Sequence, residues 1–344
     1  HVAKTRILDV HGFGSKKATL DFIEKIEHID PDIIHLHNIH GYYINIKILF
    51  EYLKKANKPV VWTLHDCWAI TGHCSHFDYI GCDKWKTGCR ECLQKREYPR
   101  SDFRDNSEDN YINKKTLFTG LRNLTIVTPS HWLANLVKES FLKEYPVVVI
   151  KNGIDLETFK PIESDFRIKH GLKNKFVILG VASSWNMKKG LDYFIELSNK
   201  LTHDERIVLV GLSEKIQKRL PAKIIGLTKT NDINELAKIY STADVFVNPT
   251  LEEVMGLTNV EALACGTPVI TFETGGCVEC VDESCGIVVE KGDLNNLING
   301  IRVIKMKNKI VYSESCINRA HLLFNKEERY SEYIELYRKM QVKI

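Results

Sequence analysis

The sequence lacks any apolar run long enough to cross a bilayer. Its longest apolar runs, at residues 145–150 and 175–182, fall far short of the roughly 20 residues that a transmembrane helix needs. Residues 1–10 contain no apolar segment of the kind that a signal peptide carries. We therefore expect a cytoplasmic protein, for which peripheral contact with the inner face of a membrane stays open.

The sequence also lacks an excess of charge of either sign. Its 48 basic and 44 acidic side chains give a formal net charge of +4, dispersed along the chain, so no nucleic-acid partner is expected. Neither a low-complexity segment nor an internal repeat of short period is present. The composition, 44% hydrophobic and 27% charged residues, is typical of a folded globular protein.

The length and the pattern of apolar runs predict two domains. A single hydrophobic core rarely grows beyond about 250 to 300 residues, and this chain has 344. Short β-rich runs alternate with helical patterns in both halves, which predicts an α/β fold with two parallel sheets. The expected strands are residues 32–38, 58–66, 124–128, 146–155, 175–182, 206–211, 222–227, 244–249, 267–272 and 286–290. The expected helices are residues 16–28, 43–56, 107–121, 130–141, 189–198, 232–241, 257–265, 293–305 and 310–344.

The expected domain limits follow from this alternation of strands and helices, which begins again after a turn near residues 152–162. The chain opens with His rather than Met and in the middle of a pattern, so we interpret it as a fragment whose first domain is truncated at its N-terminus. The expected parts are a first domain at 1–155 with a cysteine-rich insertion at about 66–104, a second domain at 156–325, and a C-terminal helix at 326–344.

Residues 248–270, NPTLEEVMGLTNVEALACGTPVI, indicate a strand, a loop, a helix and a second strand. In doubly wound sheets ligands bind at the carboxyl ends of strands, where a following helix offers free N–H groups and the positive end of its dipole. Gly256 would let the backbone approach a bulky anion, and the N–H groups of Leu257 and Thr258 would face it. This arrangement predicts a diphosphate site.

The same segment carries acids where apolar packing would be expected. Glu253 in the loop and Glu261 in the helix can face one crevice, and a carboxylate that accepts hydrogen bonds from two adjacent hydroxyls can hold a sugar or a ribose. Glu252 competes for the role of Glu253 because the two are adjacent. The alternative is that Glu253 caps the helix and that Glu261 is a solvated helix acid.

This segment resembles the donor site of retaining glycosyltransferases of family four, which have the GT-B fold of two Rossmann-like domains that face each other across a cleft. The similarity continues at residues 152–161, 188–197, 237–249 and 274–279. It implies transfer of a sugar from a nucleotide-diphosphate sugar to a glycan or lipid-linked acceptor, with retention at the anomeric carbon. The implied setting is bacterial polysaccharide, capsule or lipopolysaccharide biosynthesis. No catalytic metal is expected, because no D-x-D motif follows a suitable strand.

The resemblance assigns roles by position. Glu253 is similar to the acid near the donor sugar, Glu261 to the acid on the nucleotide ribose, and Lys189 to the lysine that binds the diphosphate. Many members have an arginine where this chain has Ser183 and Ser184, so one cation is missing unless Lys188 compensates. The turn formed by Gly275 and Gly276 resembles the family's loop beside the donor.

The first half offers His65, which directly follows the buried strand VVWTL. An imidazole there can hydrogen-bond a sugar hydroxyl, and family members carry a histidine at the corresponding strand end that contacts the donor sugar. A purely structural His65 is the alternative. His35 and His37 are interpreted as strand-end packing or as residues of the acceptor side.

The family's glycine-rich loop is the main feature that the chain does not match. Residues 11–17, HGFGSKK, imitate it weakly and follow no strand, so we interpret the loop as lost with upstream residues. Two alternatives to a transferase remain: a sugar-nucleotide 2-epimerase, which shares the fold, and an inactive fragment that only binds a nucleotide sugar.

The insertion holds a cysteine cluster that could bind zinc. Cysteines of a cytosolic protein should be thiols, and Cys74, Cys82, Cys89 and Cys92 end in a C-x2-C pair typical of half a zinc site. His73 or His76 could replace a cysteine, and free cysteines are the alternative.

Basic and aromatic residues of the insertion could contact a lipid diphosphate or an anionic membrane, or form a solvated face: Lys84, Trp85, Lys86, Arg90, Lys95, Arg96 and Arg100.

Overall fold

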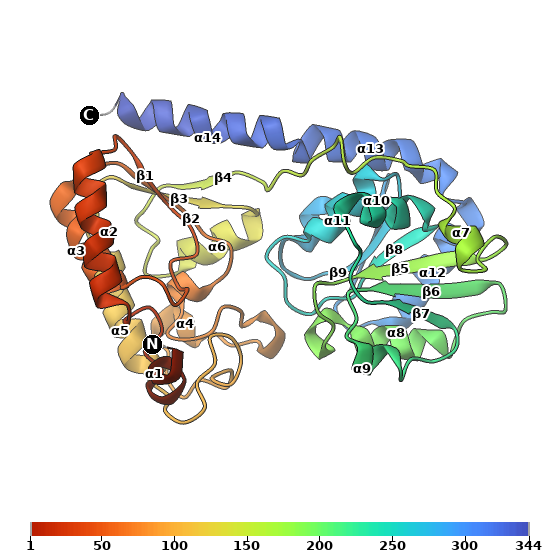
Figure 1. The fold of residues 1–344 in the computed structure, drawn as a ribbon, viewed down its shortest axis with the longest axis horizontal. Helices are drawn as coiled ribbons and strands as arrows, with labels where there is room; N and C mark the ends of the chain where they lie inside the picture. Colours follow the sequence, from red (N-terminus) through yellow and green to blue (C-terminus); the bar gives the residue numbers. More distant parts are fainter. Residues whose placement is uncertain (1, 343–344) are drawn as a thin grey trace. The chain divides into compact units, whose positions relative to one another are not determined.

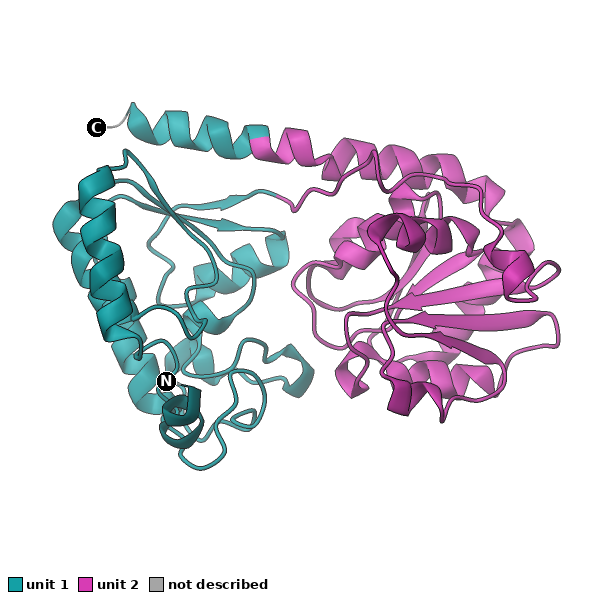
Figure 2. Ribbon diagram, viewed as in Figure 1, with its two compact units in different colours: residues 1–150, 331–344 teal, residues 151–330 magenta. Residues whose placement is uncertain are grey.

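The computed structural model describes residues 2–342 and divides the chain into two compact units (Figure 2). Unit 1 comprises residues 1–150 and 331–344, and unit 2 comprises residues 151–330. Each unit contains one parallel β-sheet, which confirms the predicted α/β class (Figure 1). None of the helices within residues 2–342 combines the length and the hydropathy that a membrane span requires.

Unit 1 is built on a four-stranded sheet of order β1-β2-β3-β4, in which every neighbouring pair is parallel. The central strand β2 is buried along its whole length, which explains why its sequence, VVWT, is apolar without alternation. The strands are β1 (Ile34–Leu36), β2 (Val60–Thr63), β3 (Leu124–Thr128) and β4 (Val147–Val149). The α-helices are α1 (Val2–Leu8), α2 (Lys16–Ile29), α3 (Ile46–Ala56), α4 (Lys84–Thr87), α5 (Ser107–Phe118) and α6 (His131–Glu139).

The C-terminal helix α14 (Lys326–Gln341) contributes its second half to unit 1. The hydroxyl of Tyr337 lies 2.6 Å from Nδ1 of His35, and the hydroxyl of Tyr333 lies 3.2 Å from Oγ1 of Thr63. These contacts attach the helix to the carboxyl ends of β1 and β2. The sequence predicts a helix at 326–344, and residues 343–344 lie outside the described part of the chain.

Unit 2 contains a six-stranded sheet of order β10-β9-β8-β5-β6-β7, again entirely parallel. The chain moves outward from β5 in one direction to β7, returns to β8, and continues in the other direction to β10. The switch point of this doubly wound sheet therefore lies between β5 and β8, where such sheets bind ligands. The strands are β5 (Phe176–Val181), β6 (Glu205–Val210), β7 (Ile224–Leu227), β8 (Val245–Asn248), β9 (Val269–Phe272) and β10 (Gly286–Val289).

Helices lie on both faces of this sheet (Figure 1). Asp232 caps α10 with its side chain and Asp293 caps α12 in the same way, by accepting from the N–H groups of Glu235 and Asn296. The α-helices are α7 (Phe166–Lys169), α8 (Leu191–Ser198), α9 (Glu214–Gln217), α10 (Ile233–Thr242), α11 (Leu257–Ala264), α12 (Leu294–Lys307) and α13 (Ile310–Phe324). Two 3₁₀ segments, η3 (Met187–Lys189) and η4 (Gly275–Cys280), follow strand ends.

All ten expected strands form, whereas the short helices α1, α4, α7 and α9 were not expected from the sequence. The last three comprise four residues each, so their sequences contain no repeat of apolar positions from which a helix could be recognised. Helix α1 buries only Thr5 and has no apolar stripe. The continuous helix expected for residues 310–344 is divided at Asn325, which has an extended ψ of 118°.

Gly211 should be essential for the stability of unit 2. Its φ of +94° is unfavourable for other residues, and a Cβ there would lie 1.6 Å from the carbonyl oxygen of Ala182. We expect Gly211→Ala to destabilise unit 2 by about 3 kcal/mol or more, measured as faster amide exchange in peptides of that unit. Gly171 also has a positive φ, +65°, but open space at its Cβ position. Gly171→Ala is therefore the control and should cost about 1 kcal/mol; equal effects would contradict the packing argument.

Candidate active site

Two loops leave the sheet of unit 2 side by side at its switch point. Residues 182–190 follow β5 and residues 249–256 follow β8, and these two strands are hydrogen-bonded neighbours. Ser184, Lys188 and Lys189 belong to the first loop, and the adjacent acids belong to the second. The strand order therefore brings together residues that lie more than sixty positions apart in the sequence.

Short backbone contacts hold the two loops together. The N–H of Leu251 donates to the carbonyl of Lys188 (2.8 Å), and Asn186 accepts from the N–H of Lys189 with its side chain (3.0 Å). Gly190 has a φ of +79°, and a Cβ there would lie 2.3 Å from the carbonyl oxygen of Pro249. Only glycine allows this close approach. The approach fixes the position of the backbone from which Lys188 and Lys189 project.

Each lysine of the first loop forms an ion pair with an acid of the second. Nζ of Lys188 lies 2.9 Å from Oε2 of Glu252, and Nζ of Lys189 lies 2.8 Å from Oε2 of Glu253. The side chain of Glu252 is only 5% exposed, whereas that of Glu253 is 27% exposed. Removing either partner would leave a charge without its counterion, most severely at the buried Glu252. Glu253 is the acid that a ligand could reach.

A third loop packs beside these two. Gly276 donates its N–H to the carbonyl of Val254 (3.1 Å), and the hydroxyl of Thr274 donates to the carbonyl of Thr250 (2.8 Å). The structure thereby places the glycine turn of Gly275 and Gly276 against the loop that carries Glu253. This turn opens η4, where Cys277 lies buried.

Helix α11 begins at this point, directly after Gly256. A Cβ on Gly256 would lie 2.9 Å from Nδ2 of Asn259 and 3.0 Å from Sγ of Cys277, so the position has no room for a side chain. The N–H of Leu257 already donates to the carbonyl of Met255 (2.9 Å). This N–H is therefore engaged within the chain, whereas the sequence predicted that it would be free to bind an anion. The turn that engages it leaves no pattern in the sequence.

Glu261 lies in the second turn of α11 and is held by α10. The hydroxyl of Tyr240 donates to Oε2 of Glu261 at 2.8 Å. Burial raises the pKa of Glu261 to about 7, while the hydrogen bond from Tyr240 acts in the opposite direction. Tyr240 is a positioning residue that sequence reasoning missed, because nothing in the sequence indicates a contact across 21 positions.

Ser184 is exposed on the first loop, next to the buried Trp185. The indole N–H of Trp185 donates to the carbonyl of Val210 (2.8 Å), which anchors the loop on β6. Trp185 and Asn186 were both missed as positioning residues. Asn186 could have been found, since an asparagine before a helical turn is a usual N-cap signal.

In unit 1 the histidines at the ends of β1 and β2 form one cluster. Nδ1 of His37 lies 2.9 Å from Nε2 of His65, and the two rings stack. Burial lowers the pKa of both imidazoles, with the neighbouring His37 as a second cause at His65. Burial also lowers the pKa of His35 to about 4, and this ring is hydrogen-bonded to Tyr337 and Thr63. His65 can therefore act as a neutral donor or acceptor near pH 7, whereas His35 is used in packing.

Four of the five cysteines of the insertion, Cys74, Cys82, Cys89 and Cys92, line one small cavity together with His73. All ten cysteines of the protein are free thiols. Within residues 2–342, no three side chains of the His, Cys, Asp and Glu types are arranged so that they could hold a metal ion. The cluster is therefore present in space, but its sulfur atoms are not at ligand geometry.

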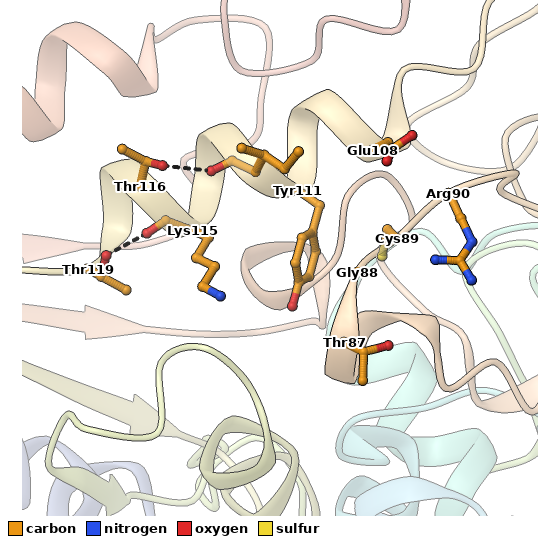
Figure 3. A pocket seen from close by; sticks show the side chains of 10 residues that line it. Thr87, Gly88, Cys89, Arg90, Glu108, Tyr111, Lys115, Thr116 and Thr119 are labelled. Atoms are coloured by element: carbon orange, nitrogen blue, oxygen red, sulfur yellow. Dashed lines mark hydrogen bonds between the residues drawn. The ribbon is translucent and has the colours of Figure 1, made fainter.

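A larger cavity of about 640 Å³ lies along α5 in unit 1 (Figure 3). Tyr111 and Lys115 project from the helix on the side of the loop that carries Thr87, Cys89 and Arg90. None of the residues assigned to the donor lines it. The size of this cavity is thus no guide to the candidate site, which is defined by the strand ends of unit 2.

Two family models match the chain, one in each of its halves. Residues 11–158 match the model described as Glycosyltransferase Family 4, and residues 174–304 match the model described as Glycosyl transferases group 1. The chain therefore belongs to the group 1 glycosyltransferases of family 4.

Curated relatives share this assignment. WcaC of Escherichia coli K12, which is named as a colanic acid biosynthesis glycosyl transferase, is 28% identical over 283 residues, or 78% of this chain and 66% of WcaC. The UDP-Gal:alpha-D-GlcNAc-diphosphoundecaprenol alpha-1,3-galactosyltransferase of Escherichia coli is 32% identical over 227 residues, or 60% of this chain and 57% of that enzyme. The matched part of the chain thus spans less than two thirds of the length of either relative.

A solved structure shares the fold. Sucrose-phosphate synthase from Thermosynechococcus elongatus matches with a TM-score of 0.73, covering 96% of this chain and 79% of that chain at 21% identity. Identity at this level shows the fold alone. The fold is the GT-B fold that the sequence predicted.

The shifted pKa of Glu261 predicts a pH dependence of stability in unit 2. Its folded-state pKa, about 7, lies above the ordinary value of 4.5, so its contribution is fully present below pH 4.5 and is lost as the pH rises through 7. Relative to Glu261→Gln, the wild type should lose about 3 kcal/mol over this range. Amide exchange of unit 2 peptides, compared between the two proteins at each pH, measures the difference.

A matched variant tests the cause. Tyr240→Phe removes the hydrogen bond that lowers the pKa of Glu261, so the loss of stability should still begin near pH 4.5 but extend to higher pH and become larger. Identical pH profiles for wild type and Glu261→Gln would contradict the assignment.

Proposed function

We propose that the protein is a retaining glycosyltransferase that moves a sugar from a nucleotide-diphosphate sugar to a glycan or lipid-linked acceptor in bacterial surface-polysaccharide biosynthesis. The observation that carries this proposal is the pairing of Lys188 and Lys189 with Glu252 and Glu253 at the switch point of a doubly wound sheet. Cations for a diphosphate and carboxylates for sugar hydroxyls lie together where such folds bind nucleotides.

The ion pairs suggest how a donor would be received. A diphosphate would replace Glu253 as the partner of Lys189. The carboxylate of Glu253 could then accept hydrogen bonds from the sugar, so neither charged side chain would be left without a partner. Lys188 would add positive charge in place of the arginine that many members carry, although its partner Glu252 is more deeply buried. The remaining donor contacts are proposed for Ser184, Gly256, Leu257, Thr258, Gly275 and Gly276, with Leu257 requiring its N–H to leave Met255.

Glu261 is proposed to hold the nucleotide ribose. Tyr240 orients one carboxylate oxygen, Oε2, and the other oxygen can accept from a hydroxyl. An ionised carboxylate accepts hydrogen bonds better than its protonated form. Because the pKa of Glu261 is about 7, binding of the nucleotide should release a proton near neutral pH.

The proposed chemistry depends on positioning and electrostatics rather than on a protein base. The diphosphate leaves from the face at which the acceptor attacks, and its oxygen takes the acceptor proton. Lys189 stabilises the charge that develops on the departing phosphate. His65, held by His37, is proposed to hydrogen-bond the transferred sugar, for which its neutral imidazole is suited.

The relatives support the proposed substrates and the proposed location of the reaction. One of them is named for a UDP-sugar donor and a lipid-linked diphosphate acceptor, which is the chemistry proposed here. Nucleotide sugars are cytoplasmic metabolites, so we place the reaction in the cytoplasm at the inner face of the membrane. We propose that the reaction needs no catalytic metal and that a structural zinc ion is bound in the cysteine cluster of unit 1.

The donor assignment is tested with a panel of nucleotide sugars. Glu261→Ala should weaken nucleotide binding about tenfold or more, because it removes a charge-assisted hydrogen bond. Glu253→Ala should chiefly lower turnover, since its proposed partner is the sugar. Glu283→Ala, a change of an exposed acid of the same unit, is the control. Calorimetry with the free nucleoside diphosphate and release of diphosphate from the donor measure the two effects.

The products separate the competing functions. Slow release of free nucleoside diphosphate supports a transferase, and an epimerised donor supports an epimerase. Binding without turnover supports an inert protein that only binds a nucleotide sugar. Negligible effects of both acid substitutions would defeat the site assignment.

Membrane contact is proposed for the insertion of unit 1. Leu93 is 80% exposed and Phe103 is 74% exposed, close in sequence to Lys95, Arg96 and Arg100. Apolar side chains flanked by basic ones are typical of proteins that bind an anionic lipid surface.

Sedimentation with vesicles tests this contact. Leu93→Ser combined with Phe103→Ser should reduce binding to vesicles that contain phosphatidylglycerol by about tenfold. Ile168→Ser, at a 72% exposed position of unit 2, should leave binding unchanged. Equal binding of the wild type to neutral phosphatidylcholine vesicles would argue against an electrostatic contact.

A further inference from the structure

The cysteine-rich segment of unit 1, residues 66–106, contains little regular structure. Its elements are the 3₁₀ segments η1 (Trp68–Ile70) and η2 (Asp78–Ile80) and the single turn of α4. It nevertheless buries two tryptophans, Trp68 and Trp85, at 1% exposure each. A segment without strands or long helices needs another source of order to hold such side chains in place.

The cavity that the four cysteines line is bordered by polar groups. The N–H of Gly72 donates to Sγ of Cys89 at 3.1 Å. Nδ1 of His73 lies 2.6 Å from Oδ1 of Asp9, so one side of this buried ring is oriented by a carboxylate. Its other nitrogen, Nε2, is buried and has no hydrogen-bond partner within residues 2–342. Such an orphaned nitrogen needs a partner in the cavity that His73 lines.

A buried cation completes these surroundings. Lys114 is 1% exposed, and its ammonium donates to the carbonyls of Trp68 (2.8 Å) and Thr71 (3.0 Å). It also lies 3.4 Å from the centre of the Trp68 ring. No carboxylate in the described part of the chain forms an ion pair with it. Burial lowers the pKa of Lys114 to about 7, whereas the neighbouring Cys89 and Cys74 act in the opposite direction, so anionic sulfur atoms beside it would keep the ammonium charged.

We propose that Cys74, Cys82, Cys89 and Cys92 bind a structural zinc ion as thiolates, and that Lys114 and the N–H of Gly72 stabilise the resulting negative charge. Four thiols lose four protons to solvent and a zinc ion with two positive charges enters, so the centre carries two negative charges. Closed sites of four cysteines are a usual form of structural zinc.

Two of the four proposed ligands already lie together, because Cys74 and Cys92 hydrogen-bond each other. Zinc replaces this bond by two metal–sulfur bonds, and the side chains rotate onto the ion. The backbone already brings all four cysteines to one cavity, so the change is confined to side chains and their loop.

Metal analysis of the full chain purified without chelator tests the proposal directly. We expect about one equivalent of zinc per chain, resistant to dialysis and released by a mercurial reagent that modifies thiols. Cys82→Ser and Cys92→Ser should lose the metal. Cys67→Ser, in the same segment but outside the cavity lining, and Cys285→Ser, in unit 2, should retain it.

The surrounding groups give a second, graded readout. Lys114→Met should still bind zinc but with about 10- to 100-fold weaker affinity, measured by competition with a chromophoric chelator. Removal of zinc should lower the thermal midpoint of unit 1, and added zinc should restore it. Unchanged affinity in this variant would overturn the proposed charge balance.

Three results would overturn the site itself. The first is less than about a tenth of an equivalent of zinc in freshly purified protein. The second is a Cys74–Cys92 disulfide in protein isolated under reducing conditions. The third is a Cys82→Ser variant that keeps its zinc while His73→Gln loses it, which would replace one cysteine by the histidine. None of these readouts depends on sugar transfer, so they are separate from the test of the proposed function.

Discussion

The hydrogen-bonded ladder between β5 and β8 is the constraint on which the candidate site depends. It pairs Ile178 with Val245 and Leu179 with Phe246, although two other strands lie between them in the sequence. Because the strands are parallel, their carboxyl ends lie at one edge and their loops leave together. The lysines of one loop therefore meet the acids of the other. A different strand order would leave the same residues in unrelated parts of the surface.

The acids of the second loop are tolerated in an otherwise apolar segment because each has a partner nearby. Lys188 neutralises the buried Glu252, Lys189 pairs with the more exposed Glu253, and Tyr240 donates to Glu261. Two of these contacts are ion pairs that a diphosphate could rearrange. The third holds a carboxyl group whose pKa is close to neutrality. A ligand that brings phosphates and hydroxyls would thus meet a site whose charges are balanced in advance.

Unit 1 meets the same physical problem in a different way. Its insertion has too little regular structure for a core of its own, and it packs on Lys114, which forms no ion pair with a carboxylate of residues 2–342. Thiols beside that lysine can become anions only if something stabilises them. A metal ion would supply both the counter-charge and the cross-link that this segment lacks, whereas unit 2 obtains its order from six paired strands.

The sequence alone determined the type and order of most elements and the residues that follow each strand. Buried parallel strands need continuous apolar runs, and such a run can be recognised from neighbouring residues in the sequence alone. The strand expected at 124–128, for example, forms at the same residues. One-turn helices such as α4 were not readable, because they contain no period. The partners of the site residues were not readable either: Tyr240 for Glu261, His37 for His65 and Asp9 for His73. These contacts join residues far apart in the chain, so only the packing of the tertiary structure decides them.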